Sequence, residues 1–352
     1  MTMWEDNVRR VVPYTPGEQP KIQNLIKLNT NENPYPPSPK VYEALKNFDA
    51  GVLKKYPDPT VSMLAGAIAK AYSRDISETF VGVGSDDVLA MAFLTFFNSD
   101  KPILFPDITY SFYDVWAELF KIPYKRIPLN EDFTINKEDY FVENGGIVLA
   151  NPNAPTGVEL PYNEVEEIIA KNHDSVVIVD EAYIDFGGLS VIDLIDKYDN
   201  LLIVRTYSKS RAAAGLRVGY AFSDKKMISY LQDVKYSFNS YTMNTTSIVL
   251  GTAAVEDKAY FEEIKDKVIK TREWTKEELK KLDFSFADSH TNFIFAKYNG
   301  NMKRDDIVKA LRDRSILVRS FNGERVKDYI RISIGTDEEM KIVIDALKEI
   351  LK

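Results

Sequence analysis

The chain has 352 residues, with 45 basic side chains against 53 acidic ones and no cysteine. A net charge of -8 argues against general binding to nucleic acid or to anionic membranes. The lack of cysteine excludes disulfides, thiolate nucleophiles and cysteine metal sites, and with only two histidines we expect no metal. The length suits one large domain with a smaller companion.

The N-terminal residues MTMWEDNVRR contain no apolar core of signal-peptide length, and no run elsewhere approaches a membrane span. We therefore expect a cytoplasmic protein that binds neither membrane nor nucleic acid. Residues 1–37 are polar and rich in proline, which indicates an extended arm with little helix. Such an arm must lie on another part of the protein.

Two short helices are predicted after the arm. Ser38 and Pro39 supply a capping hydroxyl and a proline for the first helical turn, and apolar residues follow at helical spacing as far as Phe48. The proline-containing segment 56–59 then breaks the chain before a second helix at roughly 60–72.

Apolar runs alternate with helical patterns from about residue 79 onward. The runs are apolar along their whole length, which predicts a mainly parallel sheet covered by helices on both faces. The expected strands are 80–83, 102–105, 147–150, 176–179, 201–204 and 218–222, and the expected helices are 86–97, 111–120 and 161–171. In open sheets of this kind, ligands bind beyond the carboxyl ends of the strands.

A long charged helical pattern at 257–281 is predicted to link two lobes. The remainder predicts a small α/β lobe, with strands at 292–297, 315–319 and 329–334 and helices at 303–313 and 337–351. The sequence thus predicts an α/β protein with an N-terminal arm (1–37), a large domain (38–256) and a small C-terminal domain (257–352) that packs with the arm.

The most informative side chains follow the strand that ends near Val204. Lys209 offers an amine that can lose water at the strand exit and form a Schiff base with an aldehyde. Ser208 and Arg217 offer a hydroxyl and a guanidinium that can hold a phosphate. This cluster is what a pyridoxal-phosphate pocket needs, although a solvated lysine and a surface ion pair are the alternatives for these residues taken alone.

Three further side chains suit such a pocket. Asp180, at the end of a predicted strand, can bind a protonated pyridine nitrogen and keep the ring an electron sink, or it can cap the next helix. Tyr183 can reach the cofactor's phenolic oxygen, and Tyr110 can stack on the pyridine ring, although core packing is the alternative for both tyrosines.

Two turns lie at strand exits. Residues 82–87 lead from a strand into a helix, and free N–H groups at a helix N-terminus bind phosphate, but the spacing is neither that of a dinucleotide fingerprint nor that of a P-loop. Residues 151–157 contain two prolines and either connect a strand to a helix or place an amide near the cofactor's ring oxygen.

In order along the chain, these segments resemble the fold-type I, pyridoxal-phosphate-dependent aminotransferases over essentially the full length. The motifs that carry the resemblance are LNTNENPYPPSP (28–39), KYPDP (55–59), GVGSDD (82–87), NPNAPTG (151–157), DEAYIDF (180–186), RTYSK (205–209), AGLRVGY (214–220) and YIRISIGT (329–336). The resemblance implies pyridoxal 5'-phosphate as the cofactor and transamination between an amino phosphate ester and a 2-oxo acid. The alternatives are transamination of aromatic amino acids, decarboxylation of phospho-amino acids, and a non-catalytic binding protein.

The resemblance also implies a role for each matching residue. Lys209 matches the Schiff-base lysine that shuttles the substrate proton, Asp180 the pyridinium partner and Tyr183 the ring-oxygen donor. The other implied cofactor contacts are the stacking ring of Tyr110, the phosphate cup of Ser85 and Asp86, and its side-chain ligands Ser208 and Arg217.

Other matching residues imply a partner subunit and a substrate pocket. Tyr56 matches the tyrosine that crosses a dimer interface to the partner's cofactor phosphate, which implies a homodimer with shared active sites. The implied substrate-anion positions are Tyr14, Arg319 and Arg331, where a guanidinium fork can grip a carboxylate or phosphate.

Two positions depart from the family pattern. Ala154 stands where a second asparagine is common, so the amide near the ring oxygen either comes from Asn153 through a shifted turn or is absent. Arg211 follows the lysine where relatives carry apolar residues; it either adds a cation near the phosphate end or points to solvent, and we favour solvent. His173 is expected to support a helix C-terminus, and His290 to serve in a turn.

Overall fold

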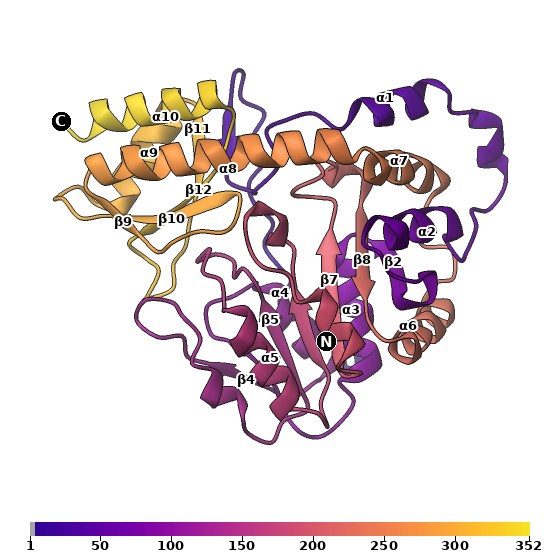
Figure 1. Ribbon diagram of the computed structural model, residues 1–352. Helices are drawn as coiled ribbons and strands as arrows, with labels where there is room; N and C mark the ends of the chain where they lie inside the picture. The colour runs from indigo at the N-terminus through magenta and orange to yellow at the C-terminus, as the bar shows by residue number, and fades with distance from the viewer. Residues whose placement is uncertain (1–3) are drawn as a thin grey trace.

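A seven-stranded sheet forms the centre of the larger unit in the computed structural model, which describes residues 4–352 (Figure 1). Its strand order is β2-β8-β7-β6-β5-β3-β4. Both neighbours of β8 are antiparallel to it, and the other pairs are parallel, so the predicted mainly parallel sheet is confirmed. The strands are β2 (Thr79–Val83), β3 (Ile103–Pro106), β4 (Tyr124–Ile127), β5 (Gly146–Ala150), β6 (Val177–Asp180), β7 (Leu201–Thr206) and β8 (Val218–Phe222).

Helices cover both faces of this sheet because successive apolar side chains of each strand point to opposite sides. On β5, Ile147 and Leu149 pack into one apolar cluster, and Val148 packs into a second cluster on the other side. The first cluster includes α1 (Pro39–Lys46), α2 (Ser62–Ala71), α5 (Tyr162–Lys171) and α7 (Thr245–Glu256), and the second includes α3 (Ser85–Phe96), α4 (Phe112–Phe120) and α6 (Lys225–Phe238).

The smaller unit contains a five-stranded sheet of order β1-β11-β12-β10-β9. The strands of this sheet are β1 (Ile26–Leu28), β9 (Phe284–Phe286), β10 (Phe293–Tyr298), β11 (Ile316–Ser320) and β12 (Tyr329–Ser333). Its helices are α8 (Lys258–Lys281), α9 (Arg304–Asp313) and α10 (Asp337–Ile350), and α8 runs along the top of Figure 1 from the small unit to α7.

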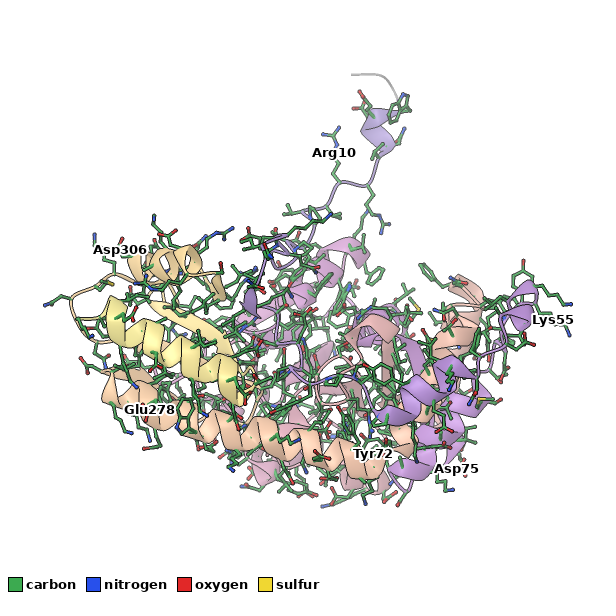
Figure 2. The ribbon with its side chains drawn as sticks, turned by 90° about the horizontal axis from the view of Figure 1, so that it is seen from above. Arg10, Lys55, Tyr72, Asp75, Glu278 and Asp306 are labelled. Atoms are coloured by element: carbon green, nitrogen blue, oxygen red, sulfur yellow. The ribbon has the colours of Figure 1, made fainter. Side chains whose placement is uncertain are left out.

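The arm contributes a strand to the small sheet. Its strand β1 pairs with β11 in parallel, Ile26 opposite Ile316, which is a strand that the sequence did not predict. Further toward the N-terminus, the chain leaves the body of the molecule near Arg10, as Figure 2 shows. We propose the divisions at 37/38 and 256/257 as domain boundaries, with the arm contributing a strand to the small domain.

The strand polarity gathers several turns at one edge of the large sheet. Because β2, β5, β6 and β7 run in the same direction, the segments after them leave the sheet at the same edge. Within residues 4–352, no helix is long and apolar enough to cross a membrane, and no group of three or more histidine and acidic side chains is arranged to hold a metal.

Candidate active site

A cavity of about 210 Å³ lies at this edge of the large sheet. Both Lys209, three residues after β7, and Asp180, the last residue of β6, line it. The predicted pyridoxal-phosphate pocket requires these two side chains to share one cavity, and the structure brings them together. Other predicted residues on its wall are Ser85, Asp86, Tyr110, Tyr183, Ser208 and Arg217.

Asp180 is a buried carboxylate without a basic partner among the described residues. Its Oδ2 accepts a hydrogen bond from the Tyr113 hydroxyl at 2.8 Å, and Oδ1 accepts one from the backbone N–H of Ala182 at 3.2 Å. Burial raises the pKa of Asp180 to about 6, because the charged form has lost its water. A protonated pyridine nitrogen would provide the missing cation, so the residues present fit pyridoxal phosphate.

Lys209 is held between the arm and Tyr183. Its Nζ donates to the backbone oxygen of Thr30 at 3.2 Å and lies 5.6 Å from the centre of the Tyr183 ring. The side-chain amide of Asn33 donates to the backbone oxygen of Lys209 at 3.0 Å. The arm therefore fixes both ends of this lysine.

The other end of the cavity suits a phosphate. Ser85 begins α3, whose N-terminal N–H groups are available to an anion, and Ser208 adds a hydroxyl. The Arg217 guanidinium reaches Ser208 Oγ at 3.4 Å and Asp86 Oδ2 at 3.5 Å. Gly84 has a φ of 84°, and a Cβ there would lie 2.4 Å from Arg217, so this close turn requires glycine.

Tyr110 lies beside the cup, where its hydroxyl donates to Asp86 Oδ1 at 2.9 Å. Burial, followed by the nearby Asp86 charge, raises the pKa of Tyr110, which keeps the phenol neutral. Its ring is thus fixed on the wall of the cavity where a planar heterocycle can stack.

Asn153 keeps its side-chain amide within its own turn, which is the second of the two alternatives that the sequence left open. Its Oδ1 accepts from Thr109 at 2.7 Å, while its Nδ2 donates to the Ile108 backbone oxygen at 2.9 Å and to Thr156 at 3.0 Å. These bonds hold the turn together, and Asn153 lines neither this cavity nor the next one. The methyl group of Ala154 faces both cavities, so the shifted turn that would bring the amide inward does not occur.

A second cavity of about 170 Å³ adjoins the first. The two share Thr30, Tyr110, Ala154, Tyr183 and Lys209, and the second adds the predicted substrate residues Tyr14, Arg319 and Arg331.

Arg331 carries the strongest sign of an anion site in this second cavity. It donates to the Asn29 backbone oxygen at 3.0 Å, but its buried Nε has no partner. Burial lowers the pKa of Arg331, as expected for a cation without a counter-charge. A carboxylate or phosphate would satisfy it.

Tyr56 is not brought to these cavities within one chain. Its side chain is 83% exposed and packs against Tyr241, with ring centres 4.8 Å apart. This position leaves the Tyr56 hydroxyl end accessible to a second molecule.

The prediction that Arg211 points to solvent is wrong. Only 7% of the residue is exposed, and its guanidinium lies 4.2 Å from the centre of the Phe261 ring at the start of α8. It donates to the Ala254 backbone oxygen at 3.4 Å and to the Tyr72 hydroxyl at 3.3 Å. Aromatic rings and backbone oxygens replace water around this cation.

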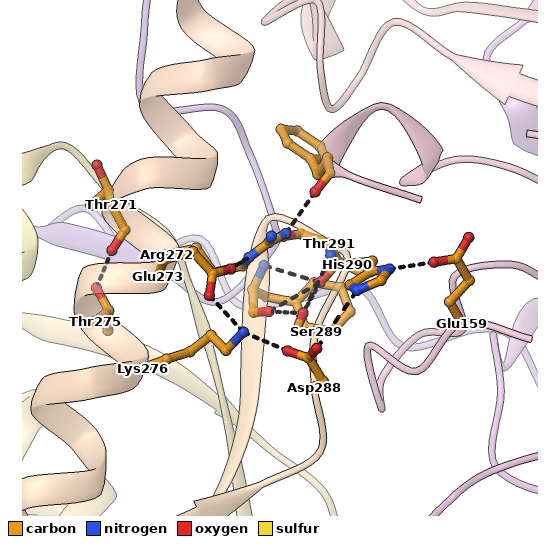
Figure 3. A network of polar contacts seen from close by, with 12 residues as sticks. Glu159, Thr271, Arg272, Glu273, Thr275, Lys276, Asp288, Ser289, His290 and Thr291 are labelled. Atoms are coloured by element: carbon orange, nitrogen blue, oxygen red, sulfur yellow. Dashed lines mark hydrogen bonds and ion pairs between the residues drawn. The ribbon is translucent and has the colours of Figure 1, made fainter. Parts of the chain in front are cut away.

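The two histidines are placed differently. His173 is exposed and pairs with Asp174, whereas α5 is capped by Asn172, so the expected helix-supporting role of His173 is not seen. His290 contacts Glu159, a residue of the large unit, through Nδ1 (Figure 3). It therefore connects the turn before β10 with the segment that follows residues 151–157.

Several wall residues were not predicted. Thr30 and Glu32 come from the arm motif, and Tyr113 supports Asp180 from behind. The signal for Tyr113 was present, because it lies three residues after Tyr110, at the start of the helix predicted at 111–120. No comparable local signal exists for the arm residues, whose position depends on pairing with the distant β11.

The sheet, the paired cavities and the residues at the strand exits define a fold-type I enzyme that acts on amino groups with a bound aldehyde cofactor. The family model for aminotransferase class I and II matches residues 23–347, and the chain belongs to this family. The resemblance and the fold class predicted from the sequence are thereby confirmed.

Relatives and solved structures agree with this membership. The chain is 48% identical to the histidinol-phosphate aminotransferase of Lactococcus lactis subsp. cremoris (strain MG1363), over 99% of this chain and 98% of the relative. It is 51% identical to that of Clostridium beijerinckii, over 99% and 97%. The crystal structure of histidinol-phosphate aminotransferase from Sinorhizobium meliloti in complex with pyridoxal-5'-phosphate has the same fold, with a TM-score of 0.84, 23% identity and coverage of 93% and 90%.

Proposed function

We propose that this chain transfers the amino group of L-histidinol phosphate to 2-oxoglutarate in histidine biosynthesis, with pyridoxal 5'-phosphate as its cofactor. The observation that carries the proposal is the shared cavity of Lys209 and Asp180, which adjoins the cavity of Arg331, whose buried Nε has no partner. The names of the relatives at 48% and 51% identity supply the substrate.

The residues of the first cavity have complementary roles in this reaction. When bound, the cofactor supplies an electron sink for the charge that develops at the substrate's α-carbon. Asp180 would hold the pyridine nitrogen in its protonated form, and Tyr110 would support the ring face. Lys209 would hold the cofactor through its aldehyde, and its amine, when free, would move the proton at the substrate's α-carbon.

The second cavity binds and orients the substrate. Arg331, with Arg319 and Tyr14 on the same wall, offers a positive fork for the phosphate of the amino donor and for a carboxylate of the oxo acid. One set of cations can serve both half-reactions, because the two substrates occupy the site in turn. The Phe293 ring, 5.2 Å from the Arg331 guanidinium, helps to exclude water from this group.

We also propose that two chains form a dimer that shares its active sites. Tyr56 packs against Tyr241, and further exposed apolar side chains lie on the same two segments: Val52 and Leu53 in η2 (Ala50–Lys54), and Phe238 at the end of α6. In Figure 2 this region, marked by Lys55, forms an outer end of the molecule. A second copy would cover this surface and receive Tyr56 near its cofactor phosphate. Cytoplasmic localisation is part of the same proposal, because the proposed substrates are small, charged metabolites.

The reaction is tested with purified holoenzyme. Lys209→Ala should abolish both turnover and the visible absorbance of the lysine-bound cofactor, whereas Lys171→Ala, at the surface end of α5, should change neither. Histidinol phosphate should react far faster than phenylalanine. Comparable rates for the two donors would favour an aromatic aminotransferase, and a protein that takes up no pyridoxal phosphate would be the non-catalytic alternative.

The dimer is tested by complementation. Lys209→Ala and Tyr56→Ala chains each form defective sites, but a mixed dimer contains one site with both native residues. Each mixed dimer has one native site of two, so pure mixed dimer should have about one half of the native activity. Random subunit exchange makes about half of the dimers mixed, so the mixture should recover about one quarter of the native activity. A monomer by light scattering, or no restored activity in a proven mixed dimer, would refute the shared site.

A further inference from the structure

Asn31, to which no role has been assigned above, forms a hydrogen bond with the hydroxyl of Tyr183. Asn31 lines the second cavity, is 1% exposed, and its Nδ2 donates to the Tyr183 hydroxyl at 2.9 Å. This is the one hydrogen bond of the Tyr183 hydroxyl within residues 4–352. Asn31 therefore decides on which side this phenol accepts a hydrogen bond.

The neighbours of Asn31 fix the direction of its amide. The Ser333 hydroxyl accepts a hydrogen bond from the backbone N–H of Asn31 at 3.0 Å and donates one to Asn31 Oδ1 at 2.9 Å. If the amide were turned over, the hydroxyl would face two donors and its own proton would lose its acceptor. The amide nitrogen must consequently face Tyr183, and the phenol acts as the acceptor in this pair.

The backbone of Asn31 is held just as firmly. Its φ of 57° lies in the left-handed region, which asparagine adopts more readily than most residues other than glycine. Asn292, just before β10, donates to the backbone oxygen of Asn31 at 2.9 Å, and Ser333 ends β12. Two segments of the small unit thus place an arm residue against a tyrosine of the large unit.

The turn at 151–157 supplies no second hydrogen-bond donor for the cofactor's ring oxygen. The amide of Asn153 is used within its own turn, and Ala154, which lines the cavity, has no polar side-chain group. Of the described side chains on this wall, Tyr183 is the one whose hydroxyl would be available to the ring oxygen of a cofactor held by Asp180 and Lys209. Its hydrogen bond would then depend on where the single phenolic proton points.

We propose that Asn31 is a positioning residue that directs the phenolic proton of Tyr183 toward the cofactor's ring oxygen. Because Asn31 donates to the phenol, the phenol's own proton is left for the cavity. The inference rests on the proposed function, since it requires bound pyridoxal phosphate. It assigns to the chain a relay from Ser333 through Asn31 to Tyr183.

The expected effect is on the protonation of the bound cofactor. A hydrogen bond to the ring oxygen stabilises negative charge there and so favours the less protonated form. Losing this bond should raise the midpoint of the pH titration of the visible absorbance by about 0.5–1 pH unit, a three- to tenfold change in proton affinity, which is the usual range for one hydrogen bond.

Three variants give an ordered series. Asn31→Gly removes the donor while retaining a residue that tolerates a positive φ, and should raise the midpoint slightly. Asn31→Asp places an acceptor in the same space, draws the phenolic proton away from the cofactor, and should raise the midpoint as far as Tyr183→Phe does. The matched control is Asn24→Gly, at an exposed position with a φ of 54°, which should leave the midpoint unchanged.

The decisive measurement combines the changes. In a Tyr183→Phe background, Asn31→Asp should move the midpoint by less than about 0.2 pH unit, because there is no phenolic proton left to redirect. An unchanged midpoint in Asn31→Asp alone, or an equal shift with and without the phenol, overturns the proposal. Cofactor uptake and turnover of the unaltered enzyme are measured alongside, so loss of these would refute the proposed function and not only the relay.

Discussion

Replacing Asp180 with asparagine should stabilise the protein without cofactor while disabling the holoenzyme. The carboxylate is buried, and the loss of water raises its pKa from 3.8 to about 6; no described residue places a cation against it. Asparagine has the same shape and can keep contacts with the Tyr113 hydroxyl and the Ala182 N–H. The substitution therefore removes a buried charge with little loss of hydrogen bonding.

The size of the effect follows from linkage between protonation and folding. A raised carboxyl pKa means that the folded state binds the proton more tightly than the unfolded chain does. Stability is then highest below the unfolded pKa of 3.8 and is lost as the pH rises through about 6. A difference of about two pH units corresponds to about 3 kcal/mol at neutral pH, an upper estimate for the gain in Asp180→Asn.

The assay is urea unfolding of both apoproteins at several pH values. The difference in unfolding free energy should be small near pH 4 and should reach about 2–3 kcal/mol in favour of Asp180→Asn above about pH 7. Other titrating groups cancel in the difference. A flat difference across this range, or a variant less stable at neutral pH, would refute the buried, uncompensated carboxylate. The holoenzyme should lose most of its activity, because the pyridine nitrogen loses its anionic partner.

Two further predictions concern the second cavity and the contact between the two units. Arg331→Lys should raise KM for histidinol phosphate and for 2-oxoglutarate alike by about ten- to a hundredfold, because a forked hydrogen bond to an anion is lost while the charge is kept. Steady-state kinetics that show a change for only one of the two substrates would contradict a shared anion site. Hydrogen bonding to Glu159 raises the pKa of His290, so its contribution to stability is full below about pH 6.5 and is lost as the pH rises through the higher folded value. His290→Gln should accordingly lower the unfolding free energy by less than about 1 kcal/mol near pH 6 and by nothing near pH 9, and an equal loss at both pH values would exclude this ion pair as the cause.

The sequence predicted the centre of the fold because the relevant signals are local. Strands such as β5, β6 and β7 are apolar throughout, since helices cover both of their faces. β4 was missed because the side chains of Lys125 and Arg126 are exposed at the edge of the sheet. β1 was missed because it has three residues and its partner β11 lies about 290 positions later in the chain.

The residues of the candidate site also divide into those with a local sequence signal and those whose position depends on distant parts of the chain. Lys209, Asp180 and Ser85 could be found from the sequence because each lies at the end of an apolar strand or the start of a helix. Arg211 was misjudged because the groups that bury it, among them Tyr72 and Phe261, come from distant helices. A charged residue in a loop is solvated unless the rest of the chain happens to enclose it, and no local pattern records that enclosure.

The arm shows why a segment with little secondary structure can decide the geometry of a site. Its backbone oxygens at Asn29 and Thr30 accept hydrogen bonds from Arg331 and Lys209, and its side chain at Asn31 holds Tyr183. An extended segment must find partners for its backbone groups outside a sheet, and here the functional side chains of two different units provide them. Since β1 anchors the arm in the small sheet, the positions of the lysine, the phenol and the substrate guanidinium are all tied to one short stretch of chain. A shift of this stretch would move all three together, so the arm couples the placement of the small unit to the chemistry at the edge of the large sheet.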